Sequence, residues 1–234
     1  MPLYAREHRS RKILIFGTGT GADIARRYFE LDSPHQVAGY VVDREFLAAP
    51  AFNGRPVVAV DDAIKTFPPD DVLAFVPLGS ARMNMLRAEK YRLLKSMGYR
   101  FATYVHASNR LEGHCEIGEN CFILENQSVN FDAAIGNNVV IWSGCQVGDR
   151  SRIGDHAFLA AHVVLNGDVT IGEYVYLGSN CNISNSVHVA TQSFIGANAL
   201  ITQNTIERAV HVVEATPAAG IDSLRFVRLL KKHS

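Results

Sequence analysis

The hydrophobic pattern of the chain changes near residue 105. From residue 105 to residue 201 every sixth residue is Val, Ile or Leu, without insertion or deletion over about a hundred positions. A fixed period over this length is the signature of a solenoid, in which each repeat stacks on its neighbours. The register therefore predicts a parallel β-helix with three faces per coil, whose aliphatic residues stack in a narrow core at intervals of eighteen positions.

Other positions of the six-residue repeat agree with this prediction. The residue after the aliphatic one is often Gly, and the residue four after it is small or Val almost throughout, with Gln127 as the large polar exception. All four cysteines occupy this small position: Cys115, Cys121, Cys145 and Cys181. A buried thiol behaves as a small hydrophobic group, and the chain has no Cys-x-x-Cys pair. We therefore assign the cysteines to the core and not to catalysis, metal binding or disulfides.

Before the repeat, short apolar runs alternate with helical patterns. Strands are predicted at residues 12–16, 36–42, 57–60 and 72–76, with one helix after the first strand and a longer one from Ser80 to Met97. This alternation is typical of a parallel sheet covered by helices. The front third is therefore predicted to be a small Rossmann-like α/β domain. It is too short for a full dinucleotide site, which argues against a dehydrogenase.

A glycine-rich turn, Gly17, Thr18, Gly19, Thr20 and Gly21, joins the first predicted strand to the helix after it. Glycines at such a turn let backbone N–H groups and the helix N-terminus approach a phosphate or another polar ligand. The spacing lacks the third glycine of the full dinucleotide motif, so a tight strand-to-helix turn without a ligand is the alternative.

Asp43 follows the second predicted strand. An acid at that place in an open α/β sheet can bind a ribose hydroxyl or a base edge, and it can equally cap the turn that follows. The sequence alone leaves both roles open.

The charge balance of the chain excludes some classes of partner. Lys and Arg together number 23, as do Asp and Glu, so no net field would attract nucleic acid or an acidic membrane surface. No apolar run is long enough to cross a bilayer. We expect a cytoplasmic protein without membrane insertion, which binds a small molecule or another protein.

These patterns divide the chain into three predicted parts. Residues 1–104 form the Rossmann-like domain, residues 105–206 the β-helix, and residues 207–234 a tail. A prism of stacked coils has open ends that need to be covered. The front domain is predicted to cap one end, and the tail, with a basic segment at 225–232, the other.

The unbroken register resembles that of the hexapeptide-repeat acyltransferases. With the motifs at residues 17–21, 78–84, 98–99 and 105–108, nearly the whole chain resembles the sugar acyltransferases typified by sialic acid O-acetyltransferase and bacillosamine N-acetyltransferase. The resemblance implies a left-handed β-helix, a homotrimer, and acetyl coenzyme A or another acyl coenzyme A as co-substrate. It also implies that the front domain holds a sugar nucleotide, with residues 17–21, Asp43 and Asn84 as its binding residues.

The same resemblance implies where coenzyme A would lie. Its contacts would be the backbone around Gly167, Ser179 and Ala197, with the adenine end near Pro217. For Gly167 the alternative is a tight corner of the coil. The basic residue that usually follows the Pro-Ala pair of the family is replaced by Ala219, which predicts weaker coenzyme A binding or a different acyl carrier.

The position of the family's catalytic histidine, five residues before the glycine of an Ile-Gly pair, is occupied by Asp149. An imidazole titrates near neutral pH, whereas an ordinary aspartate is a much weaker base. Three hypotheses follow. Asp149 is a base with a raised pKa, or the acceptor is an amine that Asp149 orients, or His162 or His156 acts in its place from a corner of the coil that faces solvent or a neighbouring subunit.

His162 is the preferred histidine, because residues 160–164 resemble a family segment that also carries histidine. The alternative for each histidine is a solvated corner residue. The spacing of His156, His162 and His188 does not match the three-histidine zinc site of the β-helix carbonic anhydrases, so no metal is predicted.

We therefore expect an acyl-coenzyme-A-dependent sugar N- or O-acyltransferase, in particular an acetyltransferase, of surface glycan biosynthesis. The alternative is a sugar-nucleotide-binding or scaffold protein that keeps the fold and has lost the chemistry. Both hypotheses start from the aspartate at position 149, where the family has its catalytic histidine.

Overall fold

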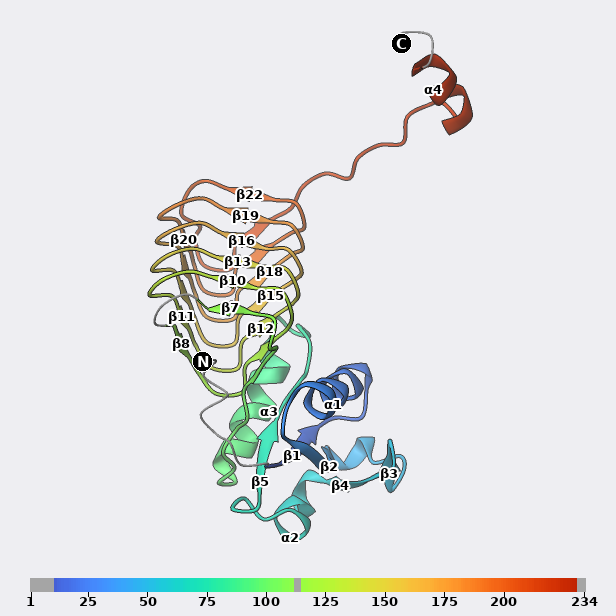
Figure 1. Cartoon of the computed structure of the whole chain (residues 1–234), viewed down its shortest axis with the longest axis vertical. Coiled ribbons are helices and arrows are strands. Elements are labelled where there is room, and N and C mark those ends of the chain that lie inside the picture. The colour runs from blue at the N-terminus through green and yellow to red at the C-terminus, as the bar shows by residue number, and fades with distance from the viewer. Residues whose placement is uncertain (1–10, 112–114, 231–234) are drawn as a thin grey trace.

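The computed structural model describes residues 11–111 and 115–230, which form a helix-covered sheet, a β-helix above it and a C-terminal tail (Figure 1). The front sheet has the strand order β3-β4-β2-β1-β5, and all of its pairs are parallel except β3 with β4. Its strands are β1 (Lys12–Phe16), β2 (Gln36–Val42), β3 (Ala51–Phe52), β4 (Arg55–Ala59) and β5 (Val72–Phe75). The four predicted strands are thus confirmed to within two residues at their ends, and only the two-residue β3 was not predicted.

Helices cover both faces of this sheet. They are α1 (Thr20–Asp32), α2 (Ala63–Thr66) and α3 (Met85–Ser96), with 3₁₀ turns at Arg44–Phe46 and Val60–Asp62. In β1, Ile13 and Ile15 pack in the cluster that contains Phe29 of α1, whereas Leu14 and Phe16 pack in the cluster that contains α3 residues. Both faces of the strand are therefore buried, which explains why β1 reads as a continuous apolar run.

The prediction that Ser80 begins the long helix is wrong, because α3 begins at Met85. Arg82, Met83 and Asn84 have φ values of 54°, 53° and 64°. This left-handed conformation cannot continue into a right-handed helix.

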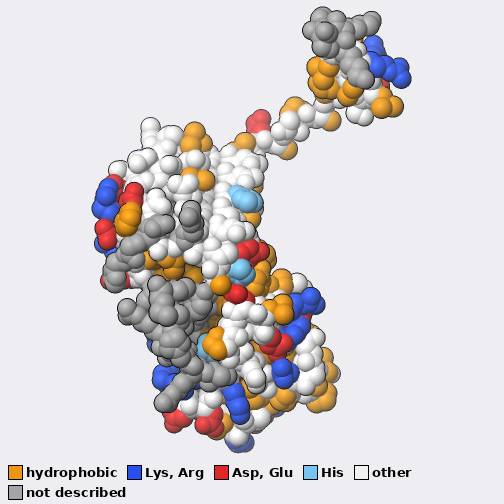
Figure 2. Space-filling model, in the orientation of Figure 1, with side chains coloured by type: hydrophobic (Ala, Val, Ile, Leu, Met, Phe, Trp, Pro, Cys, Tyr) orange, Lys and Arg blue, Asp and Glu red, His pale blue; other side chains and the backbone are white. Residues whose placement is uncertain are grey.

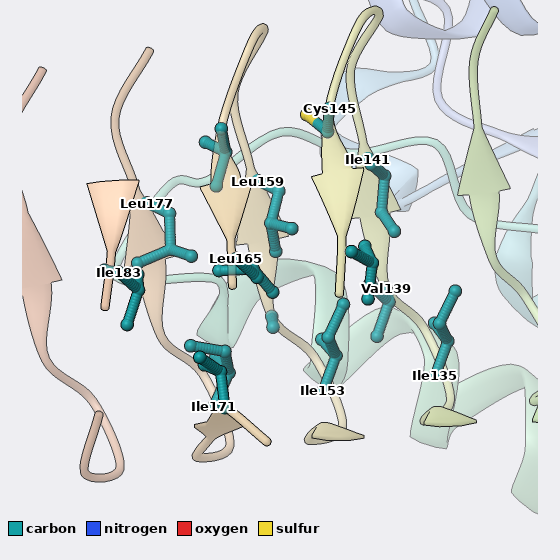
Figure 3. Close-up of a cluster of buried hydrophobic side chains, with 14 of the residues drawn as sticks. Ile135, Val139, Ile141, Cys145, Ile153, Leu159, Leu165, Ile171, Leu177 and Ile183 are labelled. Carbon is teal, nitrogen blue, oxygen red and sulfur yellow. The ribbon is translucent and has the colours of Figure 1, made fainter. Parts of the chain in front are cut away.

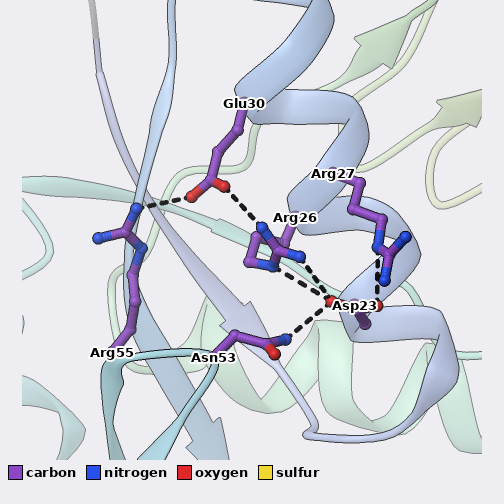
Figure 4. Close-up of polar contacts among 6 residues, drawn as sticks. All are labelled: Asp23, Arg26, Arg27, Glu30, Asn53 and Arg55. Carbon is purple, nitrogen blue, oxygen red and sulfur yellow. Dashed lines mark hydrogen bonds and ion pairs between the residues drawn. The ribbon is translucent and has the colours of Figure 1, made fainter.

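A polar network joins α1 to the β3–β4 hairpin (Figure 4). Asp23 accepts hydrogen bonds from Arg26, Arg27 and Asn53, and Glu30 accepts from Arg26 and Arg55. Partly exposed ion pairs contribute little free energy each, about 0–1 kcal/mol. Their effect is to orient the hairpin against α1.

The β-helix consists of two-residue strands that form three parallel sheets. The first face contains β6 (Tyr104–Val105), β9 (Phe122–Ile123), β12 (Val140–Ile141), β15 (Phe158–Leu159), β18 (Tyr176–Leu177), β21 (Phe194–Ile195) and β23 (Val210–His211). The second face contains β7 (Arg110–Leu111), β10 (Ser128–Val129), β13 (Gln146–Val147), β16 (Val164–Leu165), β19 (Asn182–Ile183) and β22 (Leu200–Ile201). The third face contains β8 (Glu116–Ile117), β11 (Ala134–Ile135), β14 (Arg152–Ile153), β17 (Thr170–Ile171) and β20 (His188–Val189).

Each strand from β6 to β22 ends on the predicted aliphatic residue and pairs with strands eighteen positions away. The parallel sheets and the six-residue repeats fit a left-handed β-helix. Inside the prism the aliphatic side chains stack in rows, as Ile135, Ile153 and Ile171 do on the third face (Figure 3).

The four cysteines are buried in or beside these rows, as predicted. Burial raises the pKa of Cys115 and Cys145 to about 11 and the pKa of Cys121 and Cys181 to about 12. Their thiols therefore stay protonated and unreactive at neutral pH.

The coils turn at three corners, which we number by the face that precedes each. The corner residue follows the stacked aliphatic residue by three positions, and it has a left-handed φ at every corner from residue 120 to residue 198. The first corner contains Asn126, Gly144, His162, Asn180 and Asn198; the second contains Asp132, Arg150, Asp168 and Ser186; the third contains Asn120, Asn138, His156, Tyr174 and Gln192. Asn, Asp and His tolerate this conformation better than most residues do.

Two predicted boundaries and the predicted end cap need correction. Tyr104 lies within β6, and β23 pairs with β21 beyond residue 206, so the coils run from residue 104 to residue 211. The tail does not cover the last coil: helix α4 (Ser223–Leu230) has no buried residue and stands away from the coils (Figure 1). No helix in the two described ranges is long and apolar enough to span a bilayer.

Candidate functional site

Helix α3 docks on the third corner of the β-helix through two fully buried polar residues, Asn84 and Arg87. The Asn84 amide donates to the backbone carbonyls of Tyr174 and Val175. Because this side chain is buried and its donors are used within the chain, Asn84 holds the α3 junction. This corrects its predicted assignment to the substrate.

The guanidinium of Arg87 binds backbone carbonyls from both parts of the molecule. It donates to Gly79 at 2.8 Å, to His156 at 2.8 Å and to Asn138 at 3.2 Å. Burial lowers the pKa of Arg87 to about 9, so the group keeps its charge at neutral pH. Sequence reasoning missed this residue, since an arginine in a helical pattern gives no signal of carbonyl partners 51 and 69 positions away.

The glycine turn lies at the end of β1, where it contacts the segment after β5. The Gly17 N–H donates to the Val41 carbonyl, and Gly17 has a φ of 100°. A Cβ on Gly21 would lie 2.5 Å from the Pro77 carbonyl oxygen, so only glycine fits there. Gly19 has open space around it. It is the N-cap residue of α1, and no side chain caps the helix there. The N–H groups at the N-terminus of α1 are therefore without a side-chain cap, and the space beside Gly19 is open.

Asp43 lies at the end of the neighbouring strand, β2, and forms an ion pair with Lys90 of α3. Its two carboxylate oxygens each lie 3.0 Å from the Lys90 ammonium. Asp43 precedes the 3₁₀ turn but makes no side-chain cap bond there, so of its two predicted roles the structure does not use the cap. The glycine turn and this ion pair occupy the carboxyl edge of adjacent parallel strands, where open α/β sheets bind ligands.

A series of contacts connects this edge to the first face of the β-helix. Gly17 lies beside Leu78, and the Leu78 and Gly79 carbonyls accept from Arg87. The Arg87 guanidinium in turn lies 5.9 Å from the centre of the Phe158 ring. The candidate ligand edge is therefore fixed next to the middle coils.

Asp149 lies beside the second corner with its carboxylate partly exposed. One carboxylate oxygen accepts the Phe131 N–H at 3.2 Å. Arg150 forms a two-pronged ion pair with Asp168 on the next coil, with both distances 2.7 Å. The guanidinium next to Asp149 in the sequence is thus bound to Asp168.

His162 is exposed at the first corner, as predicted. Its ring lies over Gly144, where an added Cβ would be 2.5 Å from the ring nitrogen Nδ1. Gly144 thus provides the room that this ring occupies, and substituting it would displace the imidazole.

His156 does not face solvent, which corrects the prediction for this corner residue. It is 4% exposed, and its Nδ1 lies 2.8 Å from the Asn138 amide nitrogen. Burial, followed by the charge of Arg92, lowers the pKa of His156 to about 4, so the ring is neutral at physiological pH. Its position between α3 and the third corner favours a structural role over catalysis.

The four predicted coenzyme A residues are not brought together within one chain. Ser179 and Ala197 lie one coil apart beside the first corner, since the Asn198 N–H donates to the Ser179 carbonyl. Gly167 lies beside the second corner, next to Asp149 and Asn185. Pro217 lies in the exposed tail.

A further polar contact joins α1 to the first corner, and sequence reasoning missed it. The Tyr28 hydroxyl donates to Glu125 at 2.8 Å, and Tyr104 donates to Asp32 at 2.8 Å. Two effects raise the pKa of Tyr28 to about 12: burial, which is the larger, and the hydrogen bond to Glu125. No sequence signal marks this pair, because its members are 97 positions apart.

Within residues 11–111 and 115–230, no three His, Cys, Asp or Glu side chains converge in a way that could hold a metal ion.

Comparison with known proteins adds family and fold information. Residues 132–167 match the family model of the bacterial transferase hexapeptide (six repeats). No curated protein matches the chain.

Several solved structures share the fold over most of their length. The acetyltransferase domain of PglB from Neisseria gonorrhoeae is 16% identical, with a TM-score of 0.73 over 86% of this chain and 96% of that one. PerB from Caulobacter crescentus, solved with coenzyme A and GDP-perosamine, is 24% identical, with a TM-score of 0.72 over 86% and 92% of the two chains. WeeI from Acinetobacter baumannii is 18% identical, with a TM-score of 0.60 over 82% and 94%. The chain therefore has hexapeptide repeats and the fold of these solved structures, two of which are named as acetyltransferases or hold coenzyme A with a sugar nucleotide.

Proposed function

We propose that this protein is an acyltransferase that moves an acyl group, in particular acetyl, from acyl coenzyme A to an amino or hydroxyl group of a nucleotide-linked sugar. The observation that carries the proposal is the ligand edge of the front sheet, held by Arg87 next to the middle coils. The same two-part fold binds coenzyme A and GDP-perosamine in PerB.

In this proposal the front sheet is a Rossmann-like domain for the nucleotide. The Gly17, Thr18, Gly19, Thr20 and Gly21 turn would hold phosphate oxygens on backbone N–H groups and on the N-terminus of α1. The N-terminus is free of a side-chain cap, which supports this role. Asp43 would meet the ribose or the base, with Lys90 fixing its carboxylate.

The transfer step needs no metal. The sugar nitrogen or oxygen attacks the thioester carbonyl carbon, and a base takes the proton of the nucleophile. The carbon–sulfur bond then breaks, and the protonated base returns this proton to the departing thiolate, so that coenzyme A leaves as the thiol. We assign the base to His162, which is exposed and seated over Gly144. Asp149, which has a partly exposed carboxylate, would attract and orient an ammonium group of the acceptor. His156 would position α3 against the coils.

A homotrimer is part of the proposal, because the predicted coenzyme A residues lie beside two different corners of one chain. In a threefold assembly the second corner of one subunit, with Asp149 and Gly167, can meet the first corner of the next, with His162, Ser179 and Ala197. A cytoplasmic setting in surface glycan biosynthesis, where sugar nucleotides and acyl coenzyme A are both available, completes the proposal.

The first test is ligand binding by thermal shift. A ligand that binds only the native state raises the melting temperature. Acetyl coenzyme A and a panel of UDP-, GDP-, CDP- and dTDP-sugars are added singly and together, and release of free thiol is then followed with each sugar that shifts the transition. The proposal predicts shifts with both ligand classes and turnover with at least one sugar.

The alternative function is a sugar-nucleotide-binding or scaffold protein, favoured by the aspartate at position 149 in place of the family's histidine. It predicts a shift with a sugar nucleotide, no shift with any acyl coenzyme A and no thiol release. That result would overturn the acyltransferase.

A further inference from the structure

The C-terminal helix α4 has no partner within the described chain. Its five apolar residues are between 48% and 71% exposed: Leu224, Phe226, Val227, Leu229 and Leu230. None of its residues is buried. Figure 2 shows α4 as a separate group of hydrophobic and basic side chains at the end of a narrow extended segment.

An isolated helix of this kind is not stable in water. It has eight residues, whereas helices shorter than about 12–15 residues are marginal even in favourable sequences. Within the described residues, positions 213–221 make no backbone hydrogen bond with the coils. The helix therefore needs an apolar surface to pack on, and within the described residues none lies against it.

The distribution of side chains around α4 indicates which surface. Arg225 and Arg228 are three positions apart and share one side of the helix, and the five apolar residues occupy the rest of its circumference. A helix that packs on a protein core usually carries a narrower apolar stripe. A helix that lies in a lipid interface carries a broad apolar face and a basic polar side.

The charge of this end of the chain points the same way. Residues 222–234 hold four of the 23 basic residues of the chain but only one of its 23 acidic residues. The tail therefore has a local excess of positive charge, although the net charge of the whole chain is zero. Basic residues beside an apolar helical face are attracted to anionic headgroups.

We propose that α4 is a membrane-surface helix, which inserts its apolar face into the headgroup boundary of an anionic bilayer while Arg225 and Arg228 contact the lipid phosphates. The linker then tethers the acyl-transfer part of the molecule at the bilayer without a membrane-spanning segment. The apolar face of α4 is separate from the acyl-transfer site. The proposal of membrane binding therefore does not depend on whether the protein is an acyltransferase.

The test is vesicle flotation of the full chain with phosphatidylcholine alone and with phosphatidylcholine containing phosphatidylserine. We expect at least tenfold stronger binding to the anionic vesicles, weakened by high salt. Val227→Asp, which places a charge in the apolar face, and the double variant Arg225→Glu, Arg228→Glu should each weaken that binding at least tenfold. Since α4 has no buried residue, both variants should keep the melting temperature of the parent.

Matched controls lie elsewhere on the surface. Leu200→Asp changes an apolar residue of the last coil that is 64% exposed, compared with 48% for Val227, and Lys65→Glu reverses an exposed charge on α2. Both variants should float as the parent does. The proposal is overturned if the full chain does not bind anionic vesicles, or if the α4 variants bind them unchanged. It is also overturned if Val227→Asp reduces the mass of the particle by light scattering and leaves flotation unaltered, because α4 would then pack on a second copy of the chain.

Discussion

The guanidinium of Arg87 lies 2.8 Å from the backbone carbonyl oxygen of His156 and donates to it. Through this bond, a helix of the front sheet is joined to a corner of the β-helix. The same guanidinium donates to the loop after β5, which adjoins the glycine turn. Arg87 therefore joins the loop beside the proposed nucleotide site to the coils, together with Asn84 and the Tyr28–Glu125 contact.

Removing this side chain should destabilise the protein strongly. Arg87→Ala leaves several buried carbonyls without donors and opens a cavity, and each unsatisfied group costs about 1–3 kcal/mol. We expect the free energy of unfolding to fall by at least about 3 kcal/mol in urea titrations. Arg92→Ala, on the same helix but at its partly exposed side, is the control and should cost less than half as much. Equal losses in the two variants would contradict the joining role of Arg87.

Stability should depend on pH through His156. Its folded-state pKa is lowered to about 4 from an ordinary value of 6.5, so the unfolded chain binds this proton more readily. The contribution of the neutral His156 ring to the free energy of unfolding is therefore complete above pH 6.5. It is lost as the pH falls from 6.5 towards 4, by up to about 3 kcal/mol. Asp155 and Arg92 also influence the ring and are kept unchanged in the test.

The measurement is the urea midpoint between pH 7.5 and pH 4.5. His156→Gln, which keeps a polar side chain without the titration, should flatten the profile relative to the parent. His162→Gln removes an exposed histidine and should leave the profile as it is. A parent profile that is already flat in this range would refute the assignment.

Substitution of two glycines of the turn should have different effects, one on stability and the other on ligand binding. Gly21→Ala pushes a methyl group against the Pro77 carbonyl and should cost about 2 kcal/mol of stability. Gly19→Ala meets no atom within 4 Å and should leave the melting temperature within about 1 °C, yet it should weaken sugar-nucleotide binding about tenfold, because the methyl group blocks close approach to the backbone. Unchanged ligand affinity in Gly19→Ala would remove the turn from the binding site.

The two candidate catalytic residues should differ in how they affect turnover. His162→Ala should lower kcat by about 10²–10⁴, the usual contribution of a general base. Asp149→Ala should raise KM for an amino-sugar acceptor at least about tenfold, because a charge-assisted hydrogen bond of about 1.5 kcal/mol or more is lost. Asp132→Ala and His188→Ala are the matched controls, and neither should change the rate. Normal turnover in both site variants would reject the site.

Local patterns carried most of the fold information. A six-residue repeat specifies a coil directly, because each aliphatic residue stacks only on neighbours one coil away. The stacked aliphatic positions and the buried cysteines could therefore be predicted. The glycine turn and Asp43 were also recognisable, since strand ends at one edge of a parallel sheet lie together. Their partners, Pro77 and Lys90, were not.

What could not be read from the residue order are contacts between distant segments. His156 and His162 occupy equivalent positions of the repeat, yet α3 buries His156 and leaves His162 exposed. Asn84, which the resemblance assigns to the sugar nucleotide, instead donates to backbone carbonyls of the β-helix, because α3 packs on that corner. A repeat makes every coil locally alike, so only the packing of a second element on one corner can distinguish one histidine from another.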